Sequence, residues 1–455
     1  MSNILLIEPD YRSKFPPLGL MRISTFHKEL GDTVTFARGK VPALHNVHWH
    51  RIYISSLFTW ELPRTLETIK YYVSAVKDPS DIVVGGIGVT LYPQFIRENV
   101  QCRIIEGPLN KPDMLDPGTP VIAKLVPDYS IIDSMFYKYR PDDSYFCRVT
   151  LGCIRRCKFC AVPLLEPIFE YFSNIGEQIH EIQARFGERQ NLVLLDNNIL
   201  AIDCFESIIE NIRASGFEAG TKRNNRQRIV DFNQGIDARL ITSKTAKLLS
   251  TICLSPVRLA FDFDAMEGPY RSAVVQLSKV GFKEFTTYIM YNYNDTPSSF
   301  YHRLKVNIEL SKELGIRVTG FPMRYIPMSD ISRQYVSTEW NWRYLRGIQC
   351  ILHAVHGIVS PNSEFFSIAF GESYEEFVEI ITMPDRYIIY RNHFKYLADD
   401  WRRLYRKLSS AEREDFLYVL AKLHKSKNRK SDMASYRQYK FLLEHYYPNG
   451  KMPRE

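Results

Sequence analysis

Three cysteines stand close together in the sequence, at positions 153, 157 and 160, within the segment TLGCIRRCKFCA. Spacings of four and three residues put three thiols on one short loop, where they can bind three irons of one iron–sulfur cluster. A four-iron cluster usually has four cysteine ligands, so three would leave one iron open for another molecule, as catalytic metal sites do. The spacing therefore predicts a cluster with a reactive position.

Two other interpretations of these cysteines stay open. Zinc sites more often combine two close cysteine pairs, or cysteine with histidine. No second pair lies nearby, and Cys147 is the only other cysteine within 40 residues. Thiols without any metal are the second alternative. The spacing favours a cluster over both.

The cysteine run resembles that of the radical S-adenosylmethionine enzymes, which tend to have an aromatic residue just before the third cysteine, here Phe159. The resemblance implies that Cys153, Cys157 and Cys160 bind a 4Fe–4S cluster and that S-adenosylmethionine chelates the open iron, with Phe159 beside the adenine. It also implies that an electron from the cluster yields a 5′-deoxyadenosyl radical. The electron would come from an external reductant such as flavodoxin or ferredoxin.

The composition is that of a globular protein of two or three domains, with 455 residues and 45% hydrophobic side chains. Eight scattered cysteines do not make a disulfide framework. The N-terminus has no basic region and no cleavage site, and no apolar stretch approaches 18 residues. We therefore expect a cytoplasmic protein with no membrane partner.

Residues 1–140 alternate short apolar runs with helical patterns, which predicts a doubly wound parallel sheet. With Pro16-Pro17-Leu18-Gly19-Leu20 and the Gly85-Gly86 pair, the segment resembles the cobalamin-binding-type domain of one branch of the radical family. The Asp-x-His-x-x-Gly loop that binds cobalt in some such proteins is absent, so cobalamin is left open. A local cluster of His45, His48 and His50 is not a recognised corrinoid site. The expected strands are 3–8, 33–37, 51–57, 81–86 and 103–106.

Residues 141–335 contain six strand patterns separated by helical patterns, which predicts a partial (β/α)6 barrel whose reactive residues follow the strands. The expected strands are 146–151, 191–195, 228–233, 257–261, 284–291 and 317–322. The cysteine loop follows the first of them, as the resemblance requires.

Polar residues follow the later strands. By resemblance, Asp196, Asn197 and Asn198 receive the amino group of S-adenosylmethionine; a turn is the alternative. Gln234, Asp237 and Arg239 stand where the family contacts ribose and the methionine carboxylate, which an arginine can clamp; an Asp237–Arg239 pair on the surface is the alternative. Asp262 and Asp264, two acids at alternate positions, could bind substrate or move a proton, or they could face solvent. The remaining candidates at the barrel mouth are Arg324 and Tyr325.

Residues 336–455 are helical in pattern and basic, and residues 401–455 hold 14 Lys and Arg against 6 Asp and Glu. Such a surface attracts nucleic acid or is simply a solvated helix face. Three functions follow: a radical S-adenosylmethionine enzyme, with methyl transfer if cobalamin is bound; cobalamin-independent radical modification of nucleic acid; or a non-catalytic binding protein with a structural metal. The sequence does not name the substrate.

Overall fold

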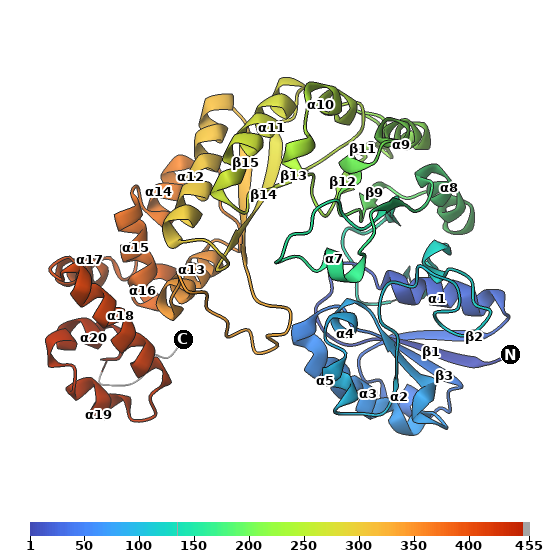
Figure 1. Ribbon diagram of the computed structural model, residues 1–455, viewed down its shortest axis with the longest axis horizontal. Coiled ribbons are helices and arrows are strands. Elements are labelled where there is room, and N and C mark those ends of the chain that lie inside the picture. The colour runs from blue at the N-terminus through green and yellow to red at the C-terminus, as the bar shows by residue number, and fades with distance from the viewer. Residues whose placement is uncertain (134, 449–455) are drawn as a thin grey trace. The chain divides into compact units, whose positions relative to one another are not determined.

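The computed structural model describes residues 1–133 and 135–448 (Figure 1). Its contacts divide the chain into two compact units. The first contains residues 1–257 and 326–335, and the second contains residues 258–325 and 336–455, of which 449–455, with Lys451 and Arg454, lie outside the described residues. The expected boundaries at 140 and 335 divide the chain differently, and the first half of the expected barrel groups with the N-terminal sheet.

The N-terminal sheet is parallel, with strand order β2-β1-β3-β4-β5. Its central strand β1 is buried from Ile4 to Glu8, as expected for a parallel strand covered on both faces. The five strands are β1 (Asn3–Glu8), β2 (Thr33–Arg38), β3 (Arg51–Ser55), β4 (Ile82–Gly85) and β5 (Arg103–Ile104). The chain reverses its direction of strand addition between β1 and β3, where doubly wound sheets bind ligands.

Helices α1 (Leu18–Glu29) and α3 (Leu62–Tyr72) cross between these strands, and each has a proline at or just before its start. Proline suits that position because its missing N–H has no helical partner there. The shorter helices of this part are α2 (Pro42–His45), α4 (Ile87–Leu91), α5 (Gln94–Arg97) and α6 (Ser130–Asp133). Figure 1 shows this sheet with its helices as the blue part of the chain.

A second parallel sheet of the first unit has the order β12-β9-β6. Its strands are β6 (Ser144–Cys147), β9 (Asn191–Leu194) and β12 (Val230–Phe232), and it is accompanied by α8 (Ile175–Phe186), α9 (Phe205–Ile212) and α10 (Ser243–Leu249). Asn174 caps α8 by accepting from the amides of Gly176 and Glu177. A short antiparallel hairpin, β10 (Lys222–Arg223) and β11 (Arg226–Gln227), precedes β12.

The first expected barrel strand does not run unbroken over 146–151. It ends as β6 at Cys147, and the chain turns before β7 (Thr150–Leu151), which pairs antiparallel with β8 (Glu170–Tyr171). The next helix, α8, begins only at Ile175. The sequence over 146–151 does not predict this turn, because the turn depends on the carboxylate of Asp196, which is distant in the chain.

The second unit contains the sheet β13-β14-β15, in which β14 and β15 are parallel. These strands are β13 (Val257–Ala260, whose first residue belongs to the first unit), β14 (Glu284–Tyr291) and β15 (Arg317–Arg324), with helices α11 (Glu267–Lys279) and α12 (Pro297–Leu314) between them. Thr296 caps α12 by accepting from the Ser299 amide at 3.1 Å. Pro322 lies in β15, at the end of the sheet order, where a missing N–H is tolerated.

Helices fill the rest of the second unit, in agreement with the expected helical region. They are α13 (Trp342–Ala354), α14 (Ser363–Phe370), α15 (Tyr374–Thr382), α16 (Asp385–Ile389), α17 (Lys395–Tyr405), α18 (Ser410–Lys425), α19 (Arg429–Ala434) and α20 (Lys440–Tyr446).

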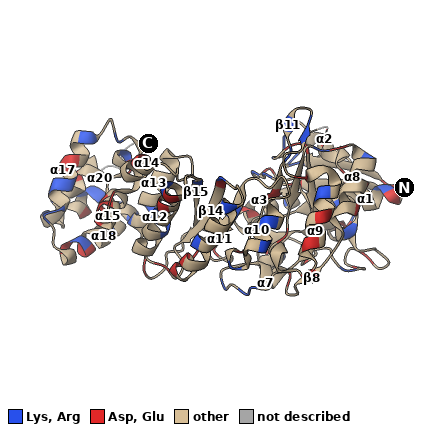
Figure 2. Ribbon diagram, turned by 90° about the horizontal axis from the view of Figure 1, so that it is seen from above, with Lys and Arg blue, Asp and Glu red and all other residues tan. Residues whose placement is uncertain are grey.

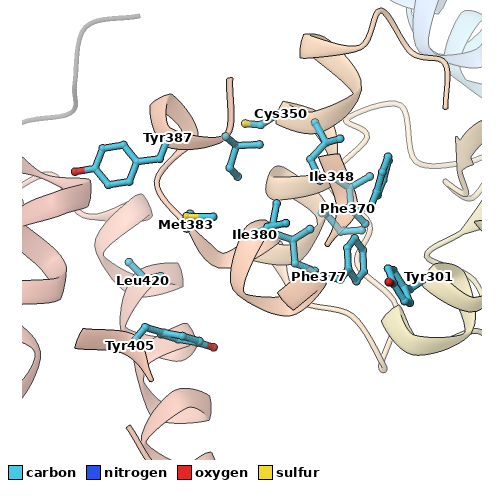
Figure 3. Close-up of a cluster of buried hydrophobic side chains, with 14 of the residues drawn as sticks. Tyr301, Ile348, Cys350, Phe370, Phe377, Ile380, Met383, Tyr387, Tyr405 and Leu420 are labelled. Atoms are coloured by element: carbon cyan, nitrogen blue, oxygen red, sulfur yellow. The ribbon is translucent and has the colours of Figure 1, made fainter. Parts of the chain in front are cut away.

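One apolar cluster joins these helices to α12, and Figure 3 shows part of it. Tyr301 of α12 stacks on Phe377 of α15 with ring centroids 5.2 Å apart. Gly347 lets α13 approach α15, because a Cβ there would lie 2.0 Å from the carbonyl oxygen of Ile381. This packing explains why residues 258–325 group with the helical region.

The chain is thus a mixed α/β protein with parallel sheets and a helical C-terminal part. The six strands expected for the barrel are present, but as two three-stranded sheets, one in each unit. Within residues 1–133 and 135–448, no helix combines the length and apolarity needed to cross a membrane.

Candidate functional site

The three cysteines lie on the loop between β7 and α7 (Val162–Leu165), and a buried carboxylate fixes the approach to that loop. Asp196, just beyond β9, uses Oδ1 to accept hydrogen bonds from the amides of Val149 and Thr150 and from the Thr150 hydroxyl, at 3.0, 2.5 and 2.7 Å. These bonds turn the chain away from the end of β6. Asp196 is only 4% exposed, so little water competes with them.

Glu166 holds the loop from its other end. Its carboxylate forms a bidentate ion pair with Arg148, accepts from the Gly152 amide at 2.8 Å, and accepts from Nδ2 of Asn197 at 3.0 Å. Bidentate arginine–carboxylate pairs fix geometry as well as adding energy. One side chain therefore joins the residues before and after the cysteines to the end of β9.

Gly152, directly before Cys153, has a φ of +70°, which L side chains rarely adopt. A Cβ at this position would lie 2.2 Å from the carbonyl oxygen of Ile168. The loop therefore requires glycine at this position for two independent reasons.

All three thiols are half-buried. The Cys153 sulfur accepts from the Arg155 amide at 3.3 Å and from Nδ2 of Asn198 at 3.4 Å, and the Cys160 sulfur accepts from the Val162 amide at 3.5 Å. Hydrogen bonds to sulfur are the contacts that cysteine-ligated clusters use. Among the described residues, no three His, Cys, Asp or Glu side chains converge on a single ion. A cube-shaped cluster does not need such convergence, because each cysteine binds a different iron.

Asp237 connects the cysteine loop to the residues beyond β12. Its carboxylate pairs with Arg239 through both oxygens, at 2.7 and 3.0 Å, and with Arg155 of the loop at 2.9 Å. Burial alone would raise the pKa of Asp237, but the hydrogen bonds from the two arginines outweigh it and the pKa is lowered. The Asp237–Arg239 ion pair is present, but the Asp237 side chain is only 6% exposed, so the pair is not a surface pair; the role of these residues toward S-adenosylmethionine stays a prediction.

Arg239 brings a positive charge near the sulfurs. The Asp237 hydrogen bond raises the pKa of Arg239, and the nearby Cys157 and Cys153 thiols raise it further. Arg239 therefore places a fixed positive charge beside two of the three sulfurs.

Two buried acceptor atoms beside the loop have no hydrogen-bond partner. They are Oδ2 of Asp196 and Oδ1 of Asn198, in side chains 4% and 3% exposed. Burial raises the pKa of Asp196, against the hydrogen bonds from Thr150. Buried acceptors are normally satisfied, so this pair fits a ligand that carries N–H donors, such as an ammonium group. The donor set of three thiols and these acceptors therefore fits both a cluster and the amino end of S-adenosylmethionine.

Phe159 lies half-buried on the loop between Cys157 and Cys160, and Gln234 is exposed beyond β12. The structure thus brings the expected residues of the first unit to the carboxyl ends of β9 and β12 and to the cysteine loop. Their roles toward S-adenosylmethionine stay predictions.

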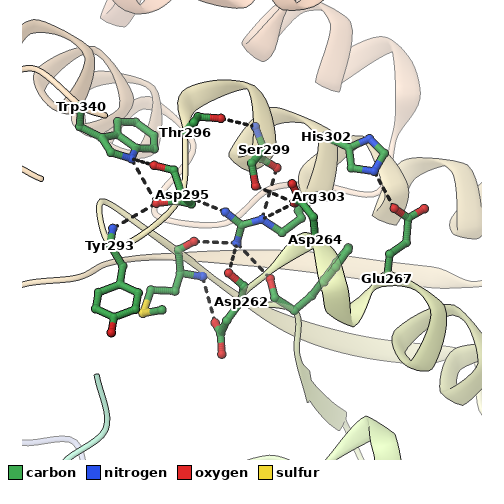
Figure 4. A network of polar contacts seen from close by, with 12 residues as sticks. Asp262, Asp264, Glu267, Tyr293, Asp295, Thr296, Ser299, His302, Arg303 and Trp340 are labelled. Atoms are coloured by element: carbon green, nitrogen blue, oxygen red, sulfur yellow. Dashed lines mark hydrogen bonds and ion pairs between the residues drawn. The ribbon is translucent and has the colours of Figure 1, made fainter. Parts of the chain in front are cut away.

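The other four expected residues belong to the second unit. Asp262 accepts from the Met290 amide at 3.2 Å, and Asp264 accepts from the Ser299 hydroxyl at 2.6 Å (Figure 4). Arg324 is the last residue of β15, and the Tyr325 ring packs against Tyr293 with centroids 4.7 Å apart. Both acids therefore have structural partners, and their catalytic roles remain hypotheses.

A buried ion pair lies behind these acids, and the sequence analysis did not identify it. Arg303 is fully buried and donates to the carbonyl oxygens of Phe261, Asp262 and Met290. It also donates to Asp295 at 2.6 Å (Figure 4). Burial raises the pKa of Asp295, while Arg303 opposes the rise. Asp295, which resembles a helix cap in sequence, is therefore a buried counter-ion.

The carboxyl edge of the N-terminal sheet is the place where a corrinoid would bind. Ser56, beyond β3, is buried with an unpartnered hydroxyl, and it lies so close to Gly86 and Gly88 that a Cβ on either would approach it within 2.7 Å. Tyr11 lies just beyond the end of β1, and its hydroxyl is 3.5 Å from Oγ of Ser55.

No histidine of residues 1–133 lies at this edge. His50 accepts from the amide of Asn3 at the start of β1, and His48 neighbours His50. His45 contacts Ser74, and His27 contacts Tyr53 from the last turn of α1. Because strands of a parallel sheet begin at one edge, these residues lie at its amino side. Among residues 1–133, this edge therefore supplies no imidazole for cobalt.

Sequence reasoning missed Arg148, Glu166 and Arg155, which shape the cysteine loop. The three are charged residues within or beside the cysteine run, and each finds its partner only after the chain has turned. Unlike a solvated charge, Glu166 is only 9% exposed at its side chain. Its position directly after a short apolar segment gave no periodic signal.

The sequence alone matches no protein-family model and no curated protein. In structure, the chain is similar to the cobalamin-dependent S-adenosylmethionine radical enzyme OxsB with aqua-cobalamin and S-adenosylmethionine bound: 13% identity, TM-score 0.51, covering 96% of this chain and 73% of that one. The same enzyme with aqua-cobalamin alone also gives 13% identity and a TM-score of 0.51, covering 99% and 76%. The chain thus shares its fold with that enzyme.

Proposed function

We propose that this protein is a radical S-adenosylmethionine enzyme in which Cys153, Cys157 and Cys160 hold a 4Fe–4S cluster. The observation that supports it best is the loop itself. Of its three half-buried thiols, Cys153 and Cys160 accept hydrogen bonds from N–H groups, and two unpartnered buried acceptors lie on the adjoining strand end. A structural zinc site does not require unpartnered buried acceptors beside its ligands.

When bound, the cluster and S-adenosylmethionine supply one-electron cleavage of the sulfonium and a 5′-deoxyadenosyl radical that removes hydrogen from an unactivated carbon. The residues of the chain bind and orient these groups. Asp196 and Asn198 would receive the ammonium group on Oδ2 and Oδ1. Arg239, held by Asp237, is a fixed cation for the carboxylate end, and Phe159 offers an apolar face for the adenine.

The test is anaerobic reconstitution with iron and sulfide. We expect about four irons and four acid-labile sulfides per chain, a brown chromophore, and a change in the reduced cluster's EPR signal when S-adenosylmethionine is added. About one zinc and no sulfide would instead support the non-catalytic protein with a structural metal. Variant Cys204→Ala, at an exposed cysteine, is the matched control for Cys153→Ala.

Methyl transfer through cobalamin is the finer proposal. It is supported by the shared fold and by the buried, unpartnered Ser56 hydroxyl beside the glycines, and it is opposed by the absence of histidine at that edge in residues 1–133. The absorbance spectrum of protein reconstituted with hydroxocobalamin and desalted tests it. A corrinoid band at one equivalent would favour methyl transfer, and a colourless desalted protein would leave oxidation or rearrangement.

Modification of nucleic acid is a second candidate, favoured by a cavity in the helical region. The cavity has a volume of about 500 Å³ and lies among α16, α17 and α20. Its lining includes Arg386, Arg403 and Phe441 together with the carboxylates of Asp400 and Glu444, and the Phe441 side chain is 67% exposed. Exposed aromatic faces with arginines suit stacked bases and phosphates. Figure 2 shows Lys and Arg distributed over these helices.

Filter binding of a fluorescent single-stranded oligonucleotide across a salt series tests this candidate. We expect affinity that falls steeply with salt and that weakens about tenfold or more in Phe441→Ala, since stacking one base is worth roughly 1–3 kcal/mol. Tyr418→Ala, an exposed aromatic on α18 that does not line the cavity, is the control. Absent or salt-insensitive binding would remove the candidate.

A further inference from the structure

Asn198 makes a side-chain contact with a candidate cluster ligand. Its Nδ2 lies 3.4 Å from the sulfur of Cys153 and 3.4 Å from Oδ2 of Asp237. The side chain is 3% exposed, and it lies 45 residues from Cys153 along the chain. The resemblance alone placed Asn198 against S-adenosylmethionine, so this contact adds a second role for the same side chain.

The contact also fixes which way the amide points. Both neighbours on this side, a thiolate and a carboxylate, accept hydrogen bonds. A flipped amide would place Oδ1 against two acceptors and would leave the N–H donors without partners. Asp237 is itself held by Arg155 and Arg239, so the amide packs against a rigid anchor.

We propose that Asn198 is a positioning residue that raises the reduction potential of the cluster by donating an N–H···S hydrogen bond to Cys153. This proposal rests on the proposed cluster. A hydrogen bond to a ligating sulfur draws electron density from the metal and stabilises the reduced, more negative state. The bond acts in a nearly water-free position, where its electrostatic effect is stronger than at the surface.

The remaining atom of the amide gives the residue its second contact. Oδ1 of Asn198 is buried without a partner and is available to the ammonium of S-adenosylmethionine. One planar group would then contact a cluster ligand on one side and the bound cosubstrate on the other. Binding of S-adenosylmethionine would hold the Asn198 amide in this orientation and so strengthen its hydrogen bond to Cys153.

The experiment is an EPR-monitored redox titration of the reconstituted full chain without S-adenosylmethionine, comparing wild type with Asn198→Ala. We expect the ratio of reduced to oxidised cluster at a fixed potential to fall roughly tenfold, which is about 59 mV for a one-electron couple. Asn191→Ala, at the opposite end of the same strand β9, is the control and should titrate like wild type.

If Asn198→Ala does not retain iron, Asn198→Asp replaces it, because it keeps the size of the side chain, removes the donor and adds negative charge. Its midpoint should lie lower still. A midpoint equal to that of wild type in the variant that binds a cluster overturns the inference. Failure of wild type to bind a cluster would overturn the proposed function instead, so the two failures are distinguishable.

Discussion

The carbonyl oxygen of Ile168 lies where a Cβ on Gly152 would have to be, only 2.2 Å from its ideal position. Since Gly152 directly precedes the first cysteine and Ile168 follows the third, this contact closes the base of the loop. Because it involves backbone atoms, no rotamer change can relieve a clash.

Gly152→Ala should therefore abolish cluster binding, because the backbone must move to admit the methyl group and φ of +70° is itself strained for alanine. Iron and sulfide analysis after reconstitution measures this. Gly187→Ala is the control: it has φ of +82° but open space around the new Cβ. It should cost about 1 kcal/mol and keep its iron. Full iron content in Gly152→Ala would contradict the loop geometry.

Glu166→Gln should make the cluster labile without preventing its formation. The neutral amide loses the bidentate ion pair with Arg148 and part of the hold on the Gly152 amide. Hydrogen bonds to charged groups contribute about 1.5–3 kcal/mol, so release of iron to a chelator should speed up by roughly tenfold or more. Glu170→Gln, at an exposed position of the nearby strand β8, should release iron like wild type. Equal rates for both variants would mean that Glu166 does not brace the loop.

Asp295→Asn should destabilise the second unit strongly, because it leaves the fully buried Arg303 without its counter-ion. Breaking a buried pair in this way costs about 3–5 kcal/mol. Denaturant unfolding followed by tryptophan fluorescence measures it. Asp264→Asn removes a carboxylate that is 55% exposed and 3.5 Å from the same arginine, and should cost less than about 1 kcal/mol. Similar losses in the two variants would contradict the assignment of Asp295 as the counter-ion.

His445 predicts a pH dependence of stability. Burial lowers the pKa of His445, while Asp400 opposes the shift and Arg386 supports it. The Tyr387 hydroxyl and Nδ1 of His445 share a hydrogen bond of 2.8 Å, in which the neutral ring can be the acceptor. The unfolded state, with a pKa near about 6.5, binds the proton more readily. Stability is therefore fully present above about pH 6.5 and is lost as pH falls through the lower folded pKa.

His445→Gln should flatten this dependence, because glutamine does not titrate and can still accept from Tyr387. The wild-type free energy of unfolding should fall between pH 7 and 5 by up to about 1.4 kcal/mol per pH unit more than that of the variant. Exposed His393→Gln should behave like wild type. Parallel pH profiles for all three proteins would refute this role for His445.

Local patterns predicted the strands well. The expected strand over 3–8 matches β1, which is a continuous apolar run, and that over 284–291 matches β14, which is rich in the β-branched and aromatic residues typical of strands. The cysteine spacing likewise placed three thiols on one loop. Both signals are contained within about ten residues.

Long-range partners could not be predicted in the same way. The break after Cys147 depends on Asp196, and the burial of Asp295 depends on Arg303 and Trp340. Asp and Asn after a strand are equally suited to turns, caps and ligands, so type and position alone do not separate these roles. The side chains of Asp196, Asn197 and Asn198 each contact the cysteine loop or the residues that hold it, which only the folded chain reveals.

The most direct test of the central claim is reductive release of 5′-deoxyadenosine from S-adenosylmethionine by anaerobically reconstituted protein with dithionite. Wild type and Cys204→Ala should release it, while Cys157→Ala should release none and remain colourless, because a loop with two thiols does not hold the cluster. Release by Cys157→Ala at the wild-type rate, or an iron-free wild-type protein, would contradict the account.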